Sequence, residues 1–154
     1  AIMAGGDAAD VDAARPLLAA LGRVTHVGGS GCGQLVKLAN QMIVGLSIGA
    51  VAEALLLVER GGGDAALAIQ AMAGGFADSR VLGLHGARMS ERDFARRAAM
   101  RVQLKDMDNA LAAADTLDLP ITRLVAKLYR DAVAHGDGEL DHSALWCELE
   151  RINR

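Results

Sequence analysis

The longest apolar segment of the chain covers residues 33–60, where apolar side chains occupy nearly every face of a helical projection. A helix of this length would span roughly 42 Å, and one that is apolar all round is either a buried core helix or a membrane span. Lys37 and Glu53 interrupt the segment, so it contains no uncharged stretch of about 18 residues. The pattern therefore predicts a buried axial helix surrounded by neighbours, and no membrane span.

Shorter helical segments follow the long one, and polar caps, glycines or a proline mark their ends. Asp64 and Ser79 are suitable N-caps, and Pro120 separates two later segments. The predicted helices cover residues 65–72, 79–89, 99–117, 121–135 and 141–151. The chain is also rich in alanine, the best helix former. This part of the sequence therefore predicts an all-α domain around one long central helix.

The first thirty residues show a different pattern, in which short β-rich runs flank one helical segment. Residues 1–4 form an apolar run, Asp7 can cap a helix over residues 8–21, and residues 24–27 are β-rich. This strand–helix–strand order is typical of α/β domains but is too short to form one. It is either a small N-terminal appendage or the tail of a truncated α/β domain, and the pattern favours the second. Because the chain does not begin with methionine, we expect it to be part of a longer protein.

Composition and charge exclude several classes of partner. The chain has 154 residues, 52% of them hydrophobic and 3% aromatic, with a formal net charge of −3. Without a basic excess or an aromatic stacking platform, nucleic-acid binding is not expected, and the apolar content is too high for a disordered chain. Cys32 and Cys147 imply no disulfide framework and no signal peptide is seen, so we expect a cytoplasmic protein. The cysteines and the four histidines lack metal-ligand spacing, so no metal site is expected.

Three polar residues near the start of the long helix are the main candidates for chemistry. Lys37, Asn40 and Gln41 are three and four residues apart, so they share one helical face. A lysine there can act as a general acid or base if burial lowers its pKa, and the amides can orient a hydroxyl or a carboxylate. The alternative is an ordinary lysine whose ammonium reaches solvent beside two amides. The spacing alone leaves both interpretations open.

Two further features carry less information by themselves. The glycine-rich turn before the long helix does not fit the dinucleotide fingerprint G-x-G-x-x-G, because Gln34 and Val36 occupy the possible positions of the third glycine. A turn that lets a backbone or a ligand approach the helix closely is the better interpretation. Lys105 and Asp106 form a charged pair in a later helix, which alone is typical of a solvated face.

Residues 28–41 resemble a motif of a known enzyme family. They read Gly-Gly-Ser-Gly-Cys-Gly-Gln-Leu-Val-Lys-Leu-Ala-Asn-Gln, which is similar to the pattern G-x-x-G-x-G-x-x-x-K-x-x-N-[NQ] of the β-hydroxyacid dehydrogenases, the family of 3-hydroxyisobutyrate dehydrogenase. Further landmarks follow in the family's order at residues 52–55, 89–94, 104–106 and 141–145, and the last is most similar to the tartronate semialdehyde reductase branch. Residues 2–6 and 15–18 resemble the end of the family's N-terminal Rossmann domain, so the resemblance covers nearly the whole chain.

The resemblance implies a role for each residue that matches the motif. Lys37 matches the family's catalytic lysine, which donates a proton when a carbonyl is reduced and accepts it when the hydroxyl is oxidised. Asn40 and Gln41 match amides near the carboxylate and the hydroxyl of the substrate. Gly31 and Gly33 match the turn that admits the substrate.

The resemblance also implies a cofactor, NAD or NADP, with Lys105 near it and Asp106 beside that lysine. Most cofactor contacts are expected in the family's N-terminal domain. Residues 1–29 are accordingly interpreted as the tail of a truncated Rossmann-type dinucleotide-binding domain, and residues 30–154 as an all-helical substrate and dimerisation domain. Ala98 occupies a position where the family often has a pocket phenylalanine, which leaves the identity of the acid open.

The expected function is the interconversion of a small β-hydroxyacid and its semialdehyde by the full-length protein, while the isolated chain is expected to be inactive. The expected partners are that small substrate and further copies of the chain, joined as a dimer or tetramer through the long helix. The alternative is a non-catalytic helical dimerisation module of a dehydrogenase-like protein. Its motivation is that the long apolar helix has too few neighbours in this chain to cover it.

Overall fold

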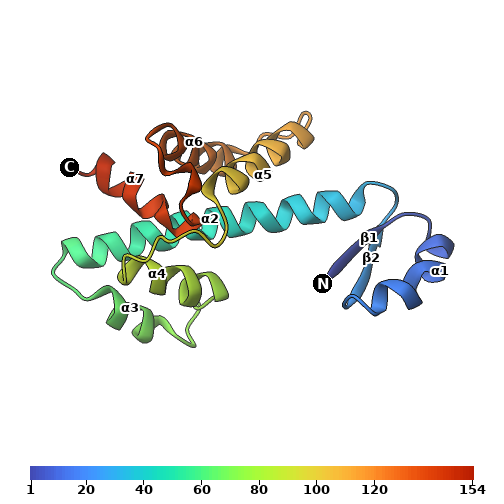
Figure 1. The fold of residues 1–154 in the computed structure, drawn as a ribbon, viewed down its shortest axis with the longest axis horizontal. Coiled ribbons are helices and arrows are strands. Elements are labelled where there is room, and N and C mark those ends of the chain that lie inside the picture. Colours follow the sequence, from blue (N-terminus) through green and yellow to red (C-terminus); the bar gives the residue numbers. More distant parts are fainter. The chain divides into compact units, whose positions relative to one another are not determined.

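The computed structural model describes all residues, 1–154, and divides them into two compact units. The first unit is Ala1–Gln41 and the second is Met42–Arg154. Helix α2, Cys32–Arg60, is the longest element (Figure 1). It contributes residues to both units. The predicted long helix is thereby confirmed, with its start one residue earlier than expected.

The first unit has the strand–helix–strand order that the sequence predicts. Strand β1, Ile2–Gly5, and strand β2, Val24–Gly28, form a two-stranded parallel sheet in which Ile2 pairs with Val24. Helix α1, Ala8–Ala19, connects the two strands. Asp7 caps this helix as expected, because its Oδ1 accepts a hydrogen bond of 2.9 Å from the Ala9 amide.

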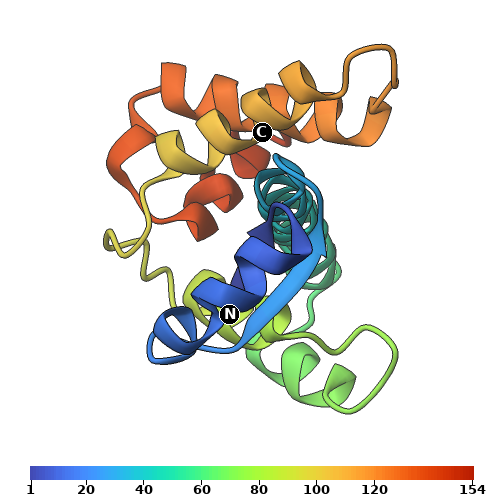
Figure 2. The ribbon, with the colours of Figure 1, turned by 90° about the vertical axis from the view of Figure 1, so that its right-hand side faces the viewer.

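The second unit is helical, and its helices lie on two sides of α2. Its helices after α2 are α3 at Ala65–Met72, a π-helical segment at Leu82–Gly86, α4 at Ala87–Ser90, α5 at Met100–Ala113, α6 at Pro120–Ala134, and α7 at Leu145–Ile152. Two short 3-10 helices, Asp137–Glu139 and His142–Ala144, lie between α6 and α7 in the sequence. Figures 1 and 2 show α3 and α4 on one side of α2 and α5, α6 and α7 on the other. The predicted helical architecture around one long helix is therefore present in this unit.

The core of the second unit is built on the buried face of α2 and on two of the few aromatic residues in the chain. Ile48 and Leu55 of α2 are fully buried, as are Tyr129 of α6 and Trp146 of α7. By length and composition alone α2 could cross a membrane, a property that it shares with the core helices of soluble proteins. The complete burial of Ile48 and Leu55 against other helices supports its interpretation as a core helix.

Three helix predictions need correction. The helix predicted over residues 141–151 begins only at Leu145, because His142–Ala144 form a 3-10 turn that Asp141 caps. The helix predicted over residues 99–117 ends at Ala113, because Asp115 adopts a left-handed conformation with φ of 52° and the Leu117 amide bonds to the Ala114 carbonyl in a turn. The helix predicted over residues 79–89 does begin at the expected cap, where Ser79 Oγ accepts from the Leu82 amide at 2.9 Å. Its middle is π-helical, which apolar periodicity does not predict.

Candidate functional site

A hollow of about 540 Å³ in the first unit collects the glycine turn and the candidate catalytic lysine. Gly31, Gly33 and Lys37 line it together with residues of β1. All three were predicted as site residues from the sequence. The structure thus brings the predicted turn and the predicted lysine to one place beside the end of a strand.

The glycines are required here because two backbone segments approach very closely. A Cβ atom on Gly33 would lie 2.4 Å from the Met3 carbonyl oxygen, and one on Gly5 would lie 2.6 Å from the Gly33 amide nitrogen. Gly31 has a φ of 87°, which other residues rarely adopt. The first turn of α2 can therefore lie directly against β1. The amides in the first turn of a helix favour a negatively charged group such as a carboxylate.

Lys37, Asn40 and Gln41 lie on one face of α2, but they do not all line the hollow. Lys37 is half-buried and lines it. Asn40 is exposed, and its Nδ2 donates a hydrogen bond of 3.0 Å to Gln41 Oε1. The two amides therefore orient each other one turn beyond the lysine, and the structure leaves their expected roles toward a substrate as a prediction.

Lys105 and Asp106 lie on α5 in the second unit and differ sharply in burial. Asp106 is 3% exposed, whereas Lys105 is exposed and places its Nζ 3.1 Å from Asp106 Oδ1. The buried carboxylate anchors the pair, while the ammonium remains at the surface. This is more structured than the solvated face that the sequence alone predicts.

Asp141 is the centre of a buried polar cluster whose importance the sequence reasoning missed. It is fully buried, and Arg88 Nη1 contacts its two carboxylate oxygens at 3.0 and 3.2 Å. Ser143 Oγ donates to Oδ1 at 2.7 Å, and the Ala98 amide donates to Oδ2 at 3.3 Å. Burial alone would raise the pKa of Asp141, but the hydrogen bonds from Ser143 and Ala98 and the charge of Arg88 outweigh it and lower the pKa to about 2.

Two histidines complete this cluster. His85 and His142 stack with ring centroids 6.2 Å apart, and His85 Nδ1 lies 3.6 Å from Asp141 Oδ1. Burial lowers the pKa of both rings, although the negative charge of Asp141 opposes the shift. The signal available in the sequence was the run of residues 141–145, whose pattern indicates only a helix start and a family landmark.

The position expected to hold a pocket phenylalanine is Ala98, which is exposed in the segment before α5. Its amide contacts Asp141, as described above. No group of three or more His, Cys, Asp or Glu residues is placed to hold a metal ion. Both cysteines are free.

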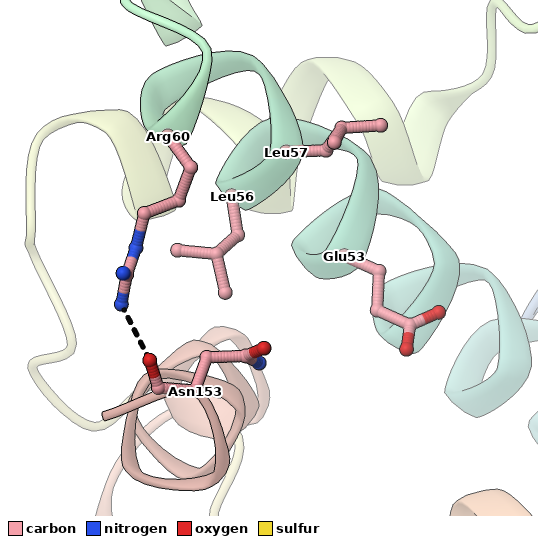
Figure 3. A pocket seen from close by; sticks show the side chains of 5 residues that line it. All are labelled: Glu53, Leu56, Leu57, Arg60 and Asn153. Atoms are coloured by element: carbon pink, nitrogen blue, oxygen red, sulfur yellow. Dashed lines mark hydrogen bonds between the residues drawn. The ribbon is translucent and has the colours of Figure 1, made fainter.

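A second hollow, of about 570 Å³, lies between the ends of α2 and α7 (Figure 3). Figure 3 shows Leu56 and Leu57 along α2 between the charged side chains of Glu53 and Arg60. Arg60 Nη2 donates to the Asn153 carbonyl at 3.1 Å and so ties the end of α2 to the C-terminal segment. None of the predicted site residues lines this hollow.

The sequence and the fold both match known proteins. Residues 31–148 match a family model described as the NAD-binding region of NADP-dependent 3-hydroxyisobutyrate dehydrogenase. The chain is 45% identical over 152 residues to the 2-hydroxy-3-oxopropionate reductase of Escherichia coli (strain K12), covering 97% of this chain and 52% of that protein. It is 35% identical over 154 residues to a probable mitochondrial 3-hydroxyisobutyrate dehydrogenase-like protein of Arabidopsis thaliana, covering 99% of this chain and 46% of that protein.

Solved structures agree with these relatives. The fold superposes on 3-hydroxyisobutyrate dehydrogenase from Salmonella typhimurium with a TM-score of 0.86 and 25% identity, covering 94% of this chain and 52% of that one. The enzyme of the same name from Mycobacterium tuberculosis gives a TM-score of 0.86 and 25% identity, covering 96% and 54%. The chain spans about half the length of the relatives that it matches. The resemblance predicted from the sequence is thus confirmed, and the chain belongs to the 3-hydroxyisobutyrate dehydrogenase family.

Proposed function

We propose that this chain is the C-terminal part of an NAD(P)-dependent oxidoreductase that interconverts a small β-hydroxyacid and its semialdehyde. The observation that carries the proposal is the hollow in the first unit, where Lys37 lies beside a turn in which Gly31 has a positive φ and Gly33 has no room for a Cβ atom. Family membership supports the reaction class, because the relatives are reductases and dehydrogenases by name.

In this proposal Lys37 is the general acid and base. Its ammonium donates a proton to the carbonyl oxygen as the semialdehyde is reduced, and its neutral amine accepts that proton in the reverse direction. The substrate carboxylate is held near Gly31 and Gly33, where the first amides of α2 favour an anion. Asn40 and Gln41 provide neutral hydrogen bonds that orient the carboxylate and hydroxyl groups.

Lys105 and Asp106 are proposed to hold the cofactor. A surface ammonium anchored by a buried carboxylate suits the phosphate groups of a dinucleotide, so these residues fit the cofactor class. When bound, the nicotinamide supplies or takes up the hydride at the carbon that carries the oxygen. The expected NAD or NADP cofactor agrees with the description of the family model that matches the chain.

We also propose that residues 1–29 are the end of a Rossmann-type domain and that residues 30–154 form the helical domain. The parallel pairing of β1 and β2 supports this, since parallel strands occur mainly in larger α/β sheets covered by helices. Leu17 and Leu21 of the α1 region are 75% and 78% exposed, which fits a helix that packs against further chain. For the same reason the isolated chain is proposed to lack turnover.

Substitution of Lys37 in the full-length protein tests the catalytic proposal. Lys37→Ala should lower kcat by roughly 10³-fold while the dissociation constant for NAD(P)H stays within about twofold. Lys37→Arg keeps the positive charge but cannot release a proton near neutral pH, so it should be almost as inactive. Lys127→Ala, which removes an exposed lysine of α6, is the control and should keep normal turnover. Near-normal turnover of the Lys37→Ala variant would show that Lys37 is not the general acid and base.

A non-catalytic dimerisation module remains the second candidate function. Its supporting observation is the exposed apolar surface of α2, where Ile43 is 66% and Leu57 is 75% exposed. A homo-oligomer through this helix would cover these residues and is compatible with the enzymatic proposal. Sedimentation at low micromolar concentration partly distinguishes the two proposals, since a compact monomer would contradict the proposal of a dimerisation module. Normal turnover in an Ile43→Glu variant that has become monomeric would show that association is not needed for activity.

A further inference from the structure

The first turn of α5 is not capped by a side chain of its own segment. Ala99 occupies the N-cap position and offers no side-chain acceptor to the helix. The Met100 amide instead donates to the Leu140 carbonyl at 2.9 Å. The start of α5 is therefore fixed by a segment that lies forty residues later in the chain.

Asp141 is the residue through which this later segment holds the chain that leads into α5. Its amide donates to the Phe94 carbonyl at 3.1 Å, and its Oδ2 accepts from the Ala98 amide at 3.3 Å. The next amide, that of His142, donates to the Ala98 carbonyl at 3.1 Å. The backbone and the side chain of Asp141 thus form hydrogen bonds with both ends of the segment 94–98.

Arg88 adds an ion pair to these hydrogen bonds, so the position of Asp141 also depends on charge. Its Nη1 contacts both carboxylate oxygens of Asp141, and its side chain is only 17% exposed. Ser143 supplies a further donor to the same carboxylate at 2.7 Å. Breaking this buried pair is costly, because the loss of either partner leaves the other charged and buried. We therefore expect the pair to keep its geometry.

The start of α5 in turn sets the position of Lys105 and Asp106. Asp106 lies six residues after Met100, so fewer than two helical turns separate it from the point that Leu140 and Asp141 hold. A helix transmits a shift at its first turn to the next turns with little loss, since its hydrogen bonds make it stiff. A misplacement of about 1 Å at a functional group can cost two orders of magnitude in rate.

We propose that Asp141, held by Arg88, is a positioning residue for cofactor binding, acting through the start of α5 on the Lys105–Asp106 pair. The inference rests on the proposed function, in which that pair holds NAD or NADP. It adds a role for the buried cluster, whose residues neither line the lysine hollow nor form the ion pair with Lys105. The predicted signature is a loss of cofactor affinity with little change in the Michaelis constant for the acid.

The test is Asp141→Asn in the full-length protein, with binding measured by the fluorescence of NADH and NADPH. The dissociation constant of the preferred cofactor should rise about tenfold, because the amide keeps the shape but cannot neutralise Arg88. Glu139→Gln is the matched control. It removes the ion pairs from Glu139 to Arg96 and Arg101, which join the same two segments at the exposed surface, and should leave cofactor binding within about twofold.

A second control separates positioning from lost stability. Leu149→Ala removes a buried side chain of α7 and lowers the Tm, yet it should not weaken cofactor binding. If Asp141→Asn does not fold, Arg88→Met carries the test, since Asp141 then keeps its bonds from Ser143 and Ala98. A folded Asp141→Asn or Arg88→Met protein that binds cofactor like the wild type overturns the inference. If the wild-type full-length protein binds neither NADH nor NADPH, the proposed function is wrong, and this inference, which rests on it, is wrong as well.

Discussion

The two compact units of the chain obtain their geometry in different ways. In Ala1–Gln41 only Val11 and Leu38 are buried hydrophobic residues, and Gly5 and Gly33 let the backbones of β1 and α2 approach closely. In Met42–Arg154 the helices enclose a continuous core of large side chains. The geometry of the first unit therefore depends on glycines that have no side chain, and that of the second unit depends on the packing of large side chains.

This difference matches the proposed division of work. In the proposed function, a glycine turn brings backbone amides and Lys37 to a small charged substrate, which needs open space and directed polar groups more than it needs a core. The second unit instead provides a stiff frame, whose packed helices hold Lys105 and Asp106 on α5. A packing defect in the first unit should therefore act mainly on chemistry, and a packing defect in the core of the second unit mainly on stability.

Among the changes that separate the two units, the largest expected effect comes from filling the space at Gly33. In the full-length protein Gly33→Ala should lower turnover at least 100-fold, because its Cβ would lie 2.4 Å from the Met3 carbonyl and must force β1 and α2 apart. Gly29→Ala lies in the same turn, meets no atom within 4 Å, and should keep turnover within about twofold. Steady-state kinetics on both variants measure the contrast. Equal activity of the two would show that the close approach is not needed.

The next effect concerns stability and separates the two units. Leu55→Ala in the core of the second unit should lower the free energy of unfolding of the 154-residue chain by about 2–5 kcal/mol. Leu17→Ala in α1 should change it by less than about 0.5 kcal/mol, since that side chain is 75% exposed. Urea unfolding monitored by circular dichroism measures both.

The same Leu17 substitution sharpens the domain proposal. In the full-length protein Leu17→Ala should become more costly than in the 154-residue chain, because the rest of a Rossmann-type domain would then cover α1. An equal, negligible cost in both proteins would contradict the assignment of residues 1–29 to such a domain.

Much of the fold could be predicted from local signals. Asp7 and Asp64 were identified as caps, and both accept the expected backbone hydrogen bonds. The long helix followed from its uninterrupted apolar run. The end of α5 could not be predicted, because Asp115 adopts a left-handed conformation that neither glycine nor proline marks.

The candidate site was predictable only where sequence neighbours form it. Lys37 and Gly33 are four residues apart, so one motif contains both. The Asp141 cluster includes Ser143, which is two residues away, but it also joins Arg88 and Ala98, whose separation from Asp141 along the chain gives no local pattern. Its interactions arise from tertiary packing, and a buried carboxylate cannot be told from a surface one by its neighbours in sequence alone.

The smallest expected effect is a pH dependence that belongs to the second unit. His85 faces Asp141, Arg88 and His142, and His142 also faces Asp106 and the Ala99 backbone. Burial lowers the pKa of both rings, so below about pH 6.5 the unfolded chain takes up protons more readily than the folded one. The stability that the neutral rings provide is therefore complete above that pH and is lost as the pH falls toward their folded pKa values.

Urea unfolding of the 154-residue chain at pH 7.5 and pH 5.5 should accordingly show a lower free energy of unfolding at the lower pH. Asp141 does not contribute to this difference, because its pKa of about 2 keeps it ionised at both values. Replacing both histidines by glutamine, His85→Gln with His142→Gln, should reduce the difference, since glutamine has no proton to gain in this range. If the double variant keeps the full difference in the free energy of unfolding between the two pH values, the pH sensitivity arises elsewhere. The buried cluster would then not be the reason for any greater acid sensitivity of the second unit.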